Sequence, residues 1–166
     1  MASPAASSRF TPWETIDRRS NRRELFVRSL NQINSAFPQL TSVKSCAMLA
    51  SGRGYLDLEF VCRCLPNVEK LTAVEPDADE MAAFKIRVAE LLPNVSTDFC
   101  QETAQSWEGS DQPFDVVLLF HCLCYIPQLE RPALLKKVAD NVVASGGLVF
   151  VPVSYTHLTL PTIYSV

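Results

Sequence analysis

The sequence predicts an α/β fold built on a doubly wound parallel sheet of about five strands. Short apolar runs alternate with segments of helical periodicity through residues 41–152, which favours parallel strands joined by right-handed crossovers. The run at 114–120 is apolar almost throughout, as expected of a strand that is buried on both faces. Gly52 and Gly54 follow one apolar run and precede a helix-like segment, which indicates a tight turn from strand to helix.

An N-terminal cap helix is expected over about 21–36. Asn21 and Glu24 have the spacing of a capping box, and Pro38 stops the helix. The apolar residues at helical spacing are Leu25, Phe26, Leu30, Ile33 and Phe37.

Two strand–helix units come next. Strands are expected at about 45–50 and 71–75, and a helix over about 55–64 follows the first of them. Asp77 and Glu80 form a second capping box, which predicts where the next helix begins. The apolar stripe of that helix consists of Met81, Phe84, Val88 and Leu91.

The remaining elements complete the alternation. A third strand is expected at 95–99, with a helical turn at about 102–107, and the buried run described above is the fourth strand. A helix over about 131–143 is expected to stop at the glycine pair 146–147, before a fifth strand at 148–151.

The composition is that of a globular protein with one domain's worth of chain: 166 residues, 48% hydrophobic and 20% charged. Lys and Arg number 15 against 18 Asp and Glu, so the net charge of −3 gives no basic surface for nucleic acid or membrane. The apolar runs are too short to span a bilayer, and the N-terminus lacks the apolar core of a secretion signal. We expect a cytoplasmic monomer whose partner is a small molecule.

The six cysteines, in a chain without a secretion signal, are expected to be reduced thiols. Cys62 and Cys64 are separated by a single residue, as are Cys122 and Cys124, whereas paired zinc ligands are usually two to four residues apart. We therefore expect buried thiols and no metal.

The last residues differ from the rest of the chain. Residues 153–166 have no charged side chain, and Val-Ser-Tyr-Thr-His-Leu-Thr-Leu-Pro-Thr resembles one translated reading frame of a sequencing adapter. We therefore expect an N-terminal segment with its cap helix at 1–40, an α/β domain at 41–152 and a non-native tail at 153–166. The natural sequence is expected to continue after Pro152, and the tail can lie along the sheet edge left open there.

The functional residues are expected where the strands end. Gly52 and Gly54 let a ligand approach the backbone closely, and the helix that starts there presents N–H groups. Glu75 ends the second strand, where a carboxylate can accept both hydroxyls of a ribose. Because the carboxyl ends of parallel strands share one sheet edge, these residues predict a site for an adenosine-type cofactor.

Two adenosine cofactors fit a glycine turn of this kind. The dinucleotide pattern G-x-G-x-x-G would place its third glycine at Asp57, where a carboxylate would separate helix from strand. The methyltransferase pattern, E/D-x-G-x-G-x-G, is filled from Ala50 to Gly54 except at its first glycine. The turn therefore favours S-adenosylmethionine over a nicotinamide cofactor.

Residues 40–152 resemble the class I S-adenosylmethionine-dependent methyltransferases. The likeness rests on Glu75 and on a strand that begins with Phe114-Asp115 and runs into an aromatic- and histidine-bearing loop. It implies a Rossmann-like sheet, here an incomplete class I methyltransferase fold, with S-adenosylmethionine as cofactor. A narrower likeness to the histamine N-methyltransferase family is carried by the segments 51–58, 74–80, 101–103 and 121–126.

The narrower resemblance implies a role for each cofactor-binding residue. Gly52 would lie under the methionine part of the cofactor, Glu75 would hold the ribose, and Glu80 would lie beside the adenosine. Residues 103–104 would border the adenine, and Phe120 would close over it. The cofactor-binding residues implied in this way are Gly52, Gly54, Glu75, Glu80, Thr103, Ala104 and Phe120.

His121 and Tyr125 follow the fourth strand, where a doubly wound sheet places ligands, and are expected to position the acceptor. His121 stands where the family has a substrate-contacting glutamine, and Ala50 stands where it has glycine. The resemblance implies methyl transfer to a small amine or imidazole-type acceptor. The alternatives are a non-catalytic cofactor-binding module of the same fold and an NAD-dependent oxidoreductase.

Overall fold

The computed structural model describes residues 22–120, 122–152 and 162–165. The chain divides into two compact units between Pro38 and Gln39. The first unit holds helix α2 (Arg22–Ala36), close to the range predicted for the cap helix. The predicted cap residue Asn21 lies outside the described residues.

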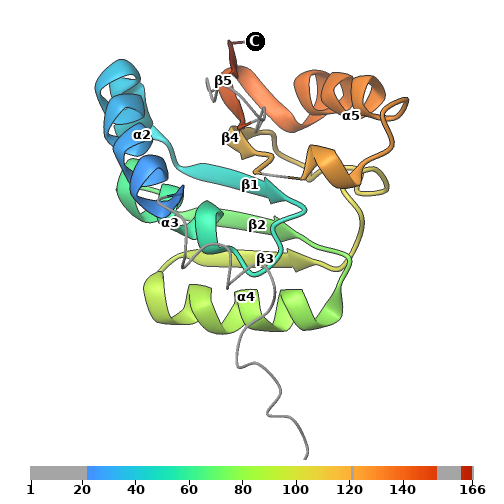
Figure 1. Ribbon diagram of the computed structural model, residues 1–166, viewed down its shortest axis with the longest axis horizontal. Helices are drawn as coiled ribbons and strands as arrows, with labels where there is room; N and C mark the ends of the chain where they lie inside the picture. The colour runs from blue at the N-terminus through green and yellow to red at the C-terminus, as the bar shows by residue number, and fades with distance from the viewer. Residues whose placement is uncertain (1–21, 121, 153–161, 166) are drawn as a thin grey trace, which may run out of the picture. The chain divides into compact units, whose positions relative to one another are not determined.

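The second unit is built on one sheet with the strand order β3-β2-β1-β4-β5-β6 (Figure 1). The first five strands are parallel to their neighbours, and β6 is antiparallel to β5. This arrangement confirms the predicted α/β fold with its five parallel strands. The strands are β1 (Ser45–Leu49), β2 (Lys70–Val74), β3 (Ser96–Cys100), β4 (Phe114–Leu118), β5 (Val143–Val151) and β6 (Thr162–Ser165).

Helices connect β1 to β2, β2 to β3 and β4 to β5, whereas the loop 101–113 joins β3 to β4. No helix within the described residues is long and apolar enough to cross a membrane. Besides α2, the helices are α3 (Tyr55–Cys64), α4 (Ala78–Leu91) and α5 (Arg131–Lys137), with the short turns η1 (Pro38–Ser42), η2 (Leu123–Tyr125) and η3 (Val138–Val142).

Apolar side chains cover both faces of the sheet. On one face, Leu134 and Val138 of the α5–η3 segment join a buried cluster with inward-facing residues of β1, β4 and β5. On the other face, the ring of Phe60 from α3 lies 4.8 Å from that of Phe150 in β5. The continuous apolar run of β4 is therefore explained by burial on both sides.

Two sequence predictions about the helices are wrong in detail. Leu91, expected on the buried stripe of α4, is half exposed, because it is the last residue of the helix. The helix after Arg131 ends at Val142 and the strand already starts at Val143, so the glycine pair lies within β5. The register explains this: Val143 pairs with Phe114 and Leu148 pairs with Val116, and the segment between forms a bulge.

The tail predicted at 153–166 contributes β6. Its backbone pairs antiparallel with β5, from Val151 opposite Thr162 to Leu148 opposite Ser165. Residues 153–161 and 166, including His157, lie outside the described residues. The outer edge of β5 therefore carries a strand drawn from the predicted tail, as expected for a segment of high β-propensity beside an open edge.

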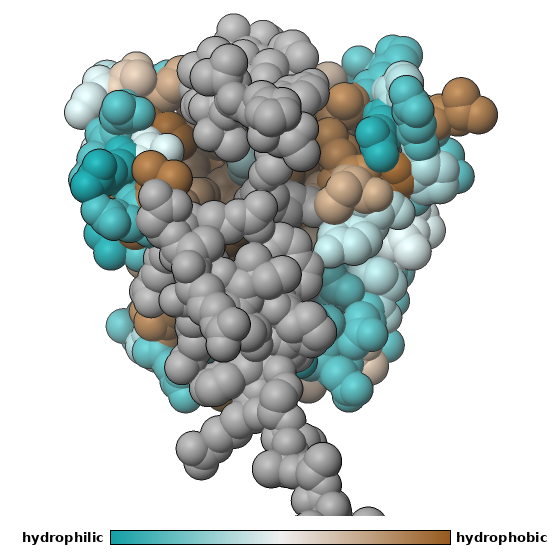
Figure 2. Space-filling model, in the orientation of Figure 1, coloured by the Kyte–Doolittle hydropathy of each residue, from teal (hydrophilic) through white to brown (hydrophobic). Residues whose placement is uncertain are grey.

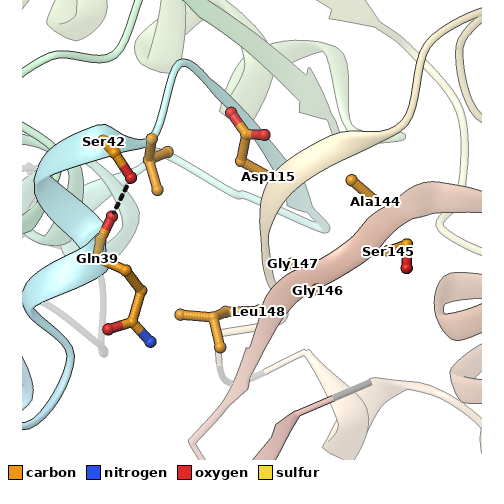
Figure 3. Close-up of a pocket in the computed structure, with 9 residues that line it drawn as sticks. Gln39, Ser42, Asp115, Ala144, Ser145, Gly146, Gly147 and Leu148 are labelled. Atoms are coloured by element: carbon orange, nitrogen blue, oxygen red, sulfur yellow. Dashed lines mark hydrogen bonds between the residues drawn. The ribbon is translucent and has the colours of Figure 1, made fainter.

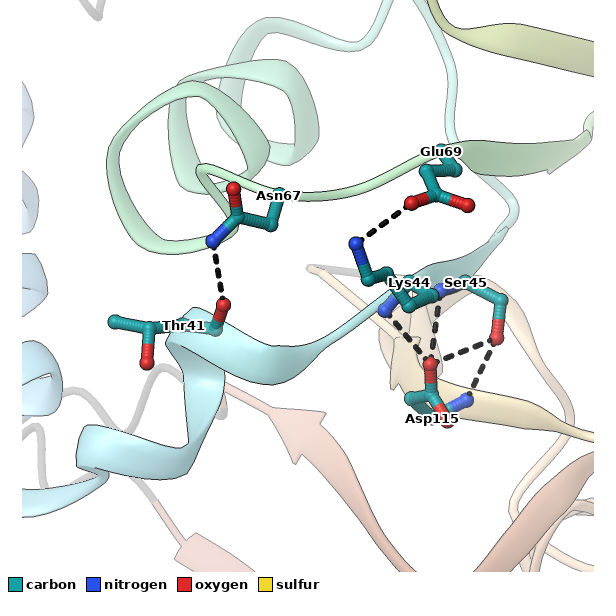
Figure 4. Close-up of polar contacts among 6 residues, drawn as sticks. All are labelled: Thr41, Lys44, Ser45, Asn67, Glu69 and Asp115. Atoms are coloured by element: carbon teal, nitrogen blue, oxygen red, sulfur yellow. Dashed lines mark hydrogen bonds and ion pairs between the residues drawn. The ribbon is translucent and has the colours of Figure 1, made fainter.

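Asp115, the acid of the Phe-Asp pair, ties the start of β4 to the start of β1 (Figure 4). Its Oδ2 accepts hydrogen bonds from the backbone N–H groups of Lys44 and Ser45 at 2.8 and 2.9 Å, and from the Ser45 hydroxyl at 3.1 Å. The Asp115 N–H in turn donates to the Ser45 hydroxyl oxygen at 3.0 Å. The acid therefore fixes the amino-terminal end of the sheet, on the side opposite to the predicted cofactor site.

We expect Asp115→Ala to lower the free energy of unfolding by about 2 kcal/mol, because hydrogen bonds to a charged group are worth about 1.5–3 kcal/mol and two backbone donors lose their acceptor. Urea unfolding measures this loss. The exposed Asp111, four residues earlier, is the matched control, and Asp111→Ala should change stability by less than about 0.5 kcal/mol. Equal effects of the two changes would contradict this role for Asp115.

Candidate active site at the carboxyl edge of the sheet

Two cavities lie at opposite ends of the strands, and their volumes, about 160 and 170 Å³, do not distinguish them. The first is lined by Gln39, Ser42, Asp115 and residues 144–148, at the amino ends of β1, β4 and β5 (Figure 3). Two of its polar side chains already bond within the fold: Asp115 as described above, and Ser42, whose hydroxyl donates to the Gln39 carbonyl at 2.7 Å. Doubly wound sheets bind ligands at the other end of their strands.

The second cavity lies at the carboxyl ends of the parallel strands. It brings together Thr103, Ala104 and Tyr125, three of the predicted site residues. The sequence predicted no ligand contact for the other wall residues, most of which are small or apolar side chains in loops. These residues are Ala50, Pro76, Gln105, Cys122 and Ile126.

The turn between β1 and α3 has a left-handed backbone at every second residue. The φ angles are +52° at Ala50, +51° at Gly52 and +71° at Gly54. Two backbone hydrogen bonds hold the turn: Ser51 N–H donates to the Val74 carbonyl at 3.2 Å, and Gly54 N–H donates to the Ser51 carbonyl at 2.9 Å. The predicted glycines therefore occupy positions that need positive φ. Ala50, where the pattern lacks its glycine, adopts the same conformation with a side chain.

Glu75 lies directly beside this turn. Its Oε2 accepts the Gly52 N–H at 2.8 Å and its Oε1 accepts the Asp77 N–H at 3.0 Å, and only 7% of the residue is exposed. A carboxylate has about four lone-pair positions, so two acceptor positions remain after these bonds. The structure thus brings Gly52 and Glu75 together, and the acid is held rigidly by two different loops.

Glu80 makes a second link between the same two loops. Its Oε1 accepts the Nε of Arg53 at 3.0 Å, with both side chains about one-third exposed. Asp77 caps α4 as predicted, since its Oδ1 accepts the N–H groups of Asp79 and Glu80, each at 2.9 Å. The Glu80 carboxylate, predicted as the second half of the capping box, meets Arg53 of the glycine turn.

Asp57 is buried just after the turn, in the first turn of α3. Only 4% of the residue is exposed, and its Oδ1 has no hydrogen-bond partner among the residues that the structure describes. The pKa of this carboxyl is raised to about 8, chiefly by burial and to a lesser extent by the nearby charge of Glu75. An acid in this position agrees poorly with a dinucleotide turn, which needs glycine where helix and strand meet.

The remaining predicted residues follow β4. Phe120 is buried, with its ring edge-on to Phe60 of α3 at 5.5 Å between centroids, and it does not line the cavity. His121 lies outside the described residues. Tyr125 is 73% exposed at the cavity wall, and Leu129 nearby in sequence is 93% exposed. Figure 2 shows hydrophobic residues in brown between larger hydrophilic areas, on the part of this face that is not drawn in grey.

A protein family model described as "Methyltransferase domain" matches residues 47–147 of the chain. The matched segment runs from β1 into β5 and includes the glycine turn, Glu75 and the whole wall of the second cavity. A search of curated proteins found no match.

Solved methyltransferase structures share the fold. The magnesium protoporphyrin IX methyltransferase of Synechocystis PCC 6803, solved with bound SAM, has a TM-score of 0.64 and 12% identity over 96% of this chain and 69% of its own. The plantazolicin methyltransferase BpumL, solved with SAH, has a TM-score of 0.58 and 21% identity over 82% and 51%. The N-methyltransferase NodS of Bradyrhizobium japonicum WM9 has a TM-score of 0.58 and 12% identity over 78% and 68%.

This chain spans about half the length of several structures that it matches. At such low identities the structural likeness concerns the fold, while the family model covers well over half of the sequence. The sheet order, the left-handed glycine turn and the acid beside it agree with that match. The chain therefore belongs to the methyltransferase domain family.

Proposed function

We propose that the chain forms the S-adenosylmethionine-binding part of a methyltransferase that acts on a small amine or imidazole-type acceptor, in the manner of histamine N-methyltransferases. Membership of the methyltransferase domain family implies this cofactor. The observation that carries the proposal is the contact of Glu75 with the Gly52 N–H at 2.8 Å, which places a fixed carboxylate beside a bare backbone turn.

The donor set fits the cofactor. The two remaining acceptor positions of Glu75 suit the two hydroxyls of a ribose. Gly52 offers a backbone without a side chain, and the nearest atom to a Cβ built there is Glu80 Oε2 at 3.8 Å. Thr103 and Ala104 supply a small, partly apolar wall of the kind that a purine contacts. Glu80 and Gly54 keep the turn in place.

Methyl transfer from a sulfonium requires little from the protein beyond positioning the two reactants. When bound, S-adenosylmethionine supplies a methyl group on a sulfonium, which a neutral amine attacks in line. The residues of this chain would bind the nucleoside, orient the acceptor and exclude water. Tyr125, exposed at the cavity wall, is proposed to position the acceptor amine together with His121, four residues earlier in the sequence. The imidazole of His121 is proposed to receive the proton that the amine loses.

We also propose a domain organisation for the chain. Residues 41–152 would be the cofactor-binding domain, 1–40 an N-terminal segment with its cap helix, and 153–166 a tail derived from an adapter. All six cysteines are free thiols, which supports a cytoplasmic location. The fold needs no nucleic acid, membrane or second copy to complete the cavity, and we propose a monomer that binds a small-molecule acceptor.

The experiment is a calorimetric titration of the chain with S-adenosylhomocysteine and, in parallel, with NAD. We expect binding of the first alone, and Glu75→Gln should weaken it about a hundredfold, because two charge-assisted hydrogen bonds to the ribose are replaced by weaker ones. The exposed Glu102→Gln is the matched control and should leave the affinity unchanged. Thermal melting of each variant checks that it is folded.

Three outcomes separate the rival functions. Binding of NAD in preference to S-adenosylhomocysteine would favour the oxidoreductase and overturn the proposal. Unchanged affinity in Glu75→Gln would remove the observation that carries it. Transfer of a labelled methyl group to a panel of amines that includes histamine tests the acceptor, and tight binding without any transfer would favour the non-catalytic module.

A further inference from the structure

A lysine of α5 holds the loop that forms one wall of the cavity. The Nζ of Lys137 donates to three backbone carbonyls of this loop: that of Ala104 at 3.1 Å, that of Gln105 at 2.8 Å and that of Trp107 at 2.6 Å. An ammonium group has three N–H donors. All three are therefore accounted for by one five-residue stretch of backbone, 103–107.

The loop is organised around this lysine by further contacts. Within it, Trp107 N–H donates to the Thr103 carbonyl at 3.0 Å, and the hydroxyls of Thr103 and Ser106 lie 2.8 Å apart. A second link comes from Gln105, whose Nε2 donates to Oε2 of Glu130, the residue directly before α5, at 3.1 Å. Apolar contacts join the loop to α5 as well, since Ala104, Trp107 and the α5 residue Leu134 belong to one buried cluster.

The bonds to Lys137 also set which way the peptide groups of the loop point. The C=O and N–H of a planar trans peptide point in opposite directions. Because the Ala104 carbonyl points to Lys137, the N–H of Gln105 in the same peptide group points away from it. Ala104 and Gln105 both line the cavity, so this N–H is a candidate donor for a ring nitrogen of a bound purine.

We propose that Lys137 is a positioning residue for cofactor binding: its ammonium gathers the three carbonyls and thereby presents the 103–107 backbone to the purine end of the ligand. This inference rests on the proposed function and concerns the same site. It differs from the ribose contact of Glu75, which lies on the other loop. The lysine acts through the loop and does not itself touch the ligand.

The test compares Lys137→Met with Lys136→Met in calorimetric titrations with S-adenosylhomocysteine and with adenosine. Methionine keeps an unbranched apolar stem that reaches as far as Cε and removes the ammonium. We expect Lys137→Met to weaken both ligands by the same factor, about tenfold, because the purine half is common to both. The exposed Lys136 pairs with Asp140, and its substitution should change neither affinity. Lys137→Arg, which keeps a cation and several donors, should recover most of the affinity.

A second measurement uses the unaltered protein, so that poor folding of a variant cannot decide the matter. Hydrogen exchange at the Gln105 amide should slow when S-adenosylhomocysteine is added. Unchanged exchange there, or a folded Lys137→Met with unchanged affinity for both ligands, would overturn the inference. A Lys137→Met variant with weaker affinity for S-adenosylhomocysteine but unchanged affinity for adenosine would overturn it as well. If Glu75→Gln also fails to weaken binding, the proposed function itself fails, and if it weakens binding as expected, only the role of Lys137 is lost.

Discussion

Replacing Gly54 with alanine is expected to lower the free energy of unfolding by about 4 kcal/mol or more, a large part of the 5–15 kcal/mol typical of a domain. A Cβ built at Gly54 would lie 2.5 Å from two ring carbons of Phe84 and 3.1 Å from a methyl of Leu58. Phe84 is fully buried, so its ring can move only at the expense of the core. The backbone φ of +71° adds the cost of a left-handed alanine.

The chain contains two controls that separate these contributions. Gly146 has a φ of +78° with no atom within 4 Å of a built Cβ, and Gly52 has a φ of +51° with its nearest atom at 3.8 Å. Alanine at either position should therefore cost only the left-handed conformation, about 1–2 kcal/mol. Urea unfolding of the three variants measures the difference. If Gly54→Ala lost no more unfolding free energy than the other two variants, this would contradict the close packing of Phe84 in α4 against the turn.

The second large effect concerns Asp57 and pH. Its pKa of about 8 in the folded protein lies far above the value of about 3.9 expected in the unfolded chain. The folded state thus holds a proton that the unfolded state releases, so the stabilising contribution of this group is complete below about pH 4. It is lost progressively as the pH rises toward 8, by up to about 6 kcal/mol at about 1.36 kcal/mol for each pH unit between the two pKa values.

Asp57→Asn, a neutral side chain of the same shape, should remove this dependence. We expect the variant to melt at a higher temperature than the parent at pH 8 and at a similar temperature at pH 4. The charge that acts on the group is that of Glu75, which directly follows β2. The nearby thiols of Cys46 and Cys122 stay neutral, because burial and the charge of Asp57 raise their pKa values. Asp111→Asn, at an exposed position, is the control. Parallel pH profiles of the parent and Asp57→Asn would contradict the raised pKa.

Much of the site followed from residues with a local conformational requirement. The turn at Gly52 and Gly54 was predictable because few other residues accept positive φ. The start of α4 was predictable because the side chain of Asp77 accepts hydrogen bonds from the N–H groups that follow it. The position of Glu75 followed from strand order alone, since β1 and β2 are neighbours and end at the same edge.

Other features depend on contacts that leave no pattern. Lys137 bonds to backbone carbonyls, which every residue has, so no spacing marks it. The glycine pair after α5 was interpreted as a helix stop, whereas a bulge against β4 places it within β5. The helix predicted over 55–64 places Asp57 in its first turn, but the burial of this side chain depends on the rotation of α3 against the sheet. The site assignments of Thr103 and Ala104 came only from the family resemblance.

The left-handed backbone at Ala50 has one more consequence. An alanine prefers other conformations by about 1–2 kcal/mol, so the bonds on either side of the turn hold this residue against its own tendency. Its methyl group reaches the cavity wall, where the glycine of the usual pattern would leave an opening. A sulfonium nucleoside entering there would therefore meet a narrower and more fixed floor than a glycine at position 50 would leave.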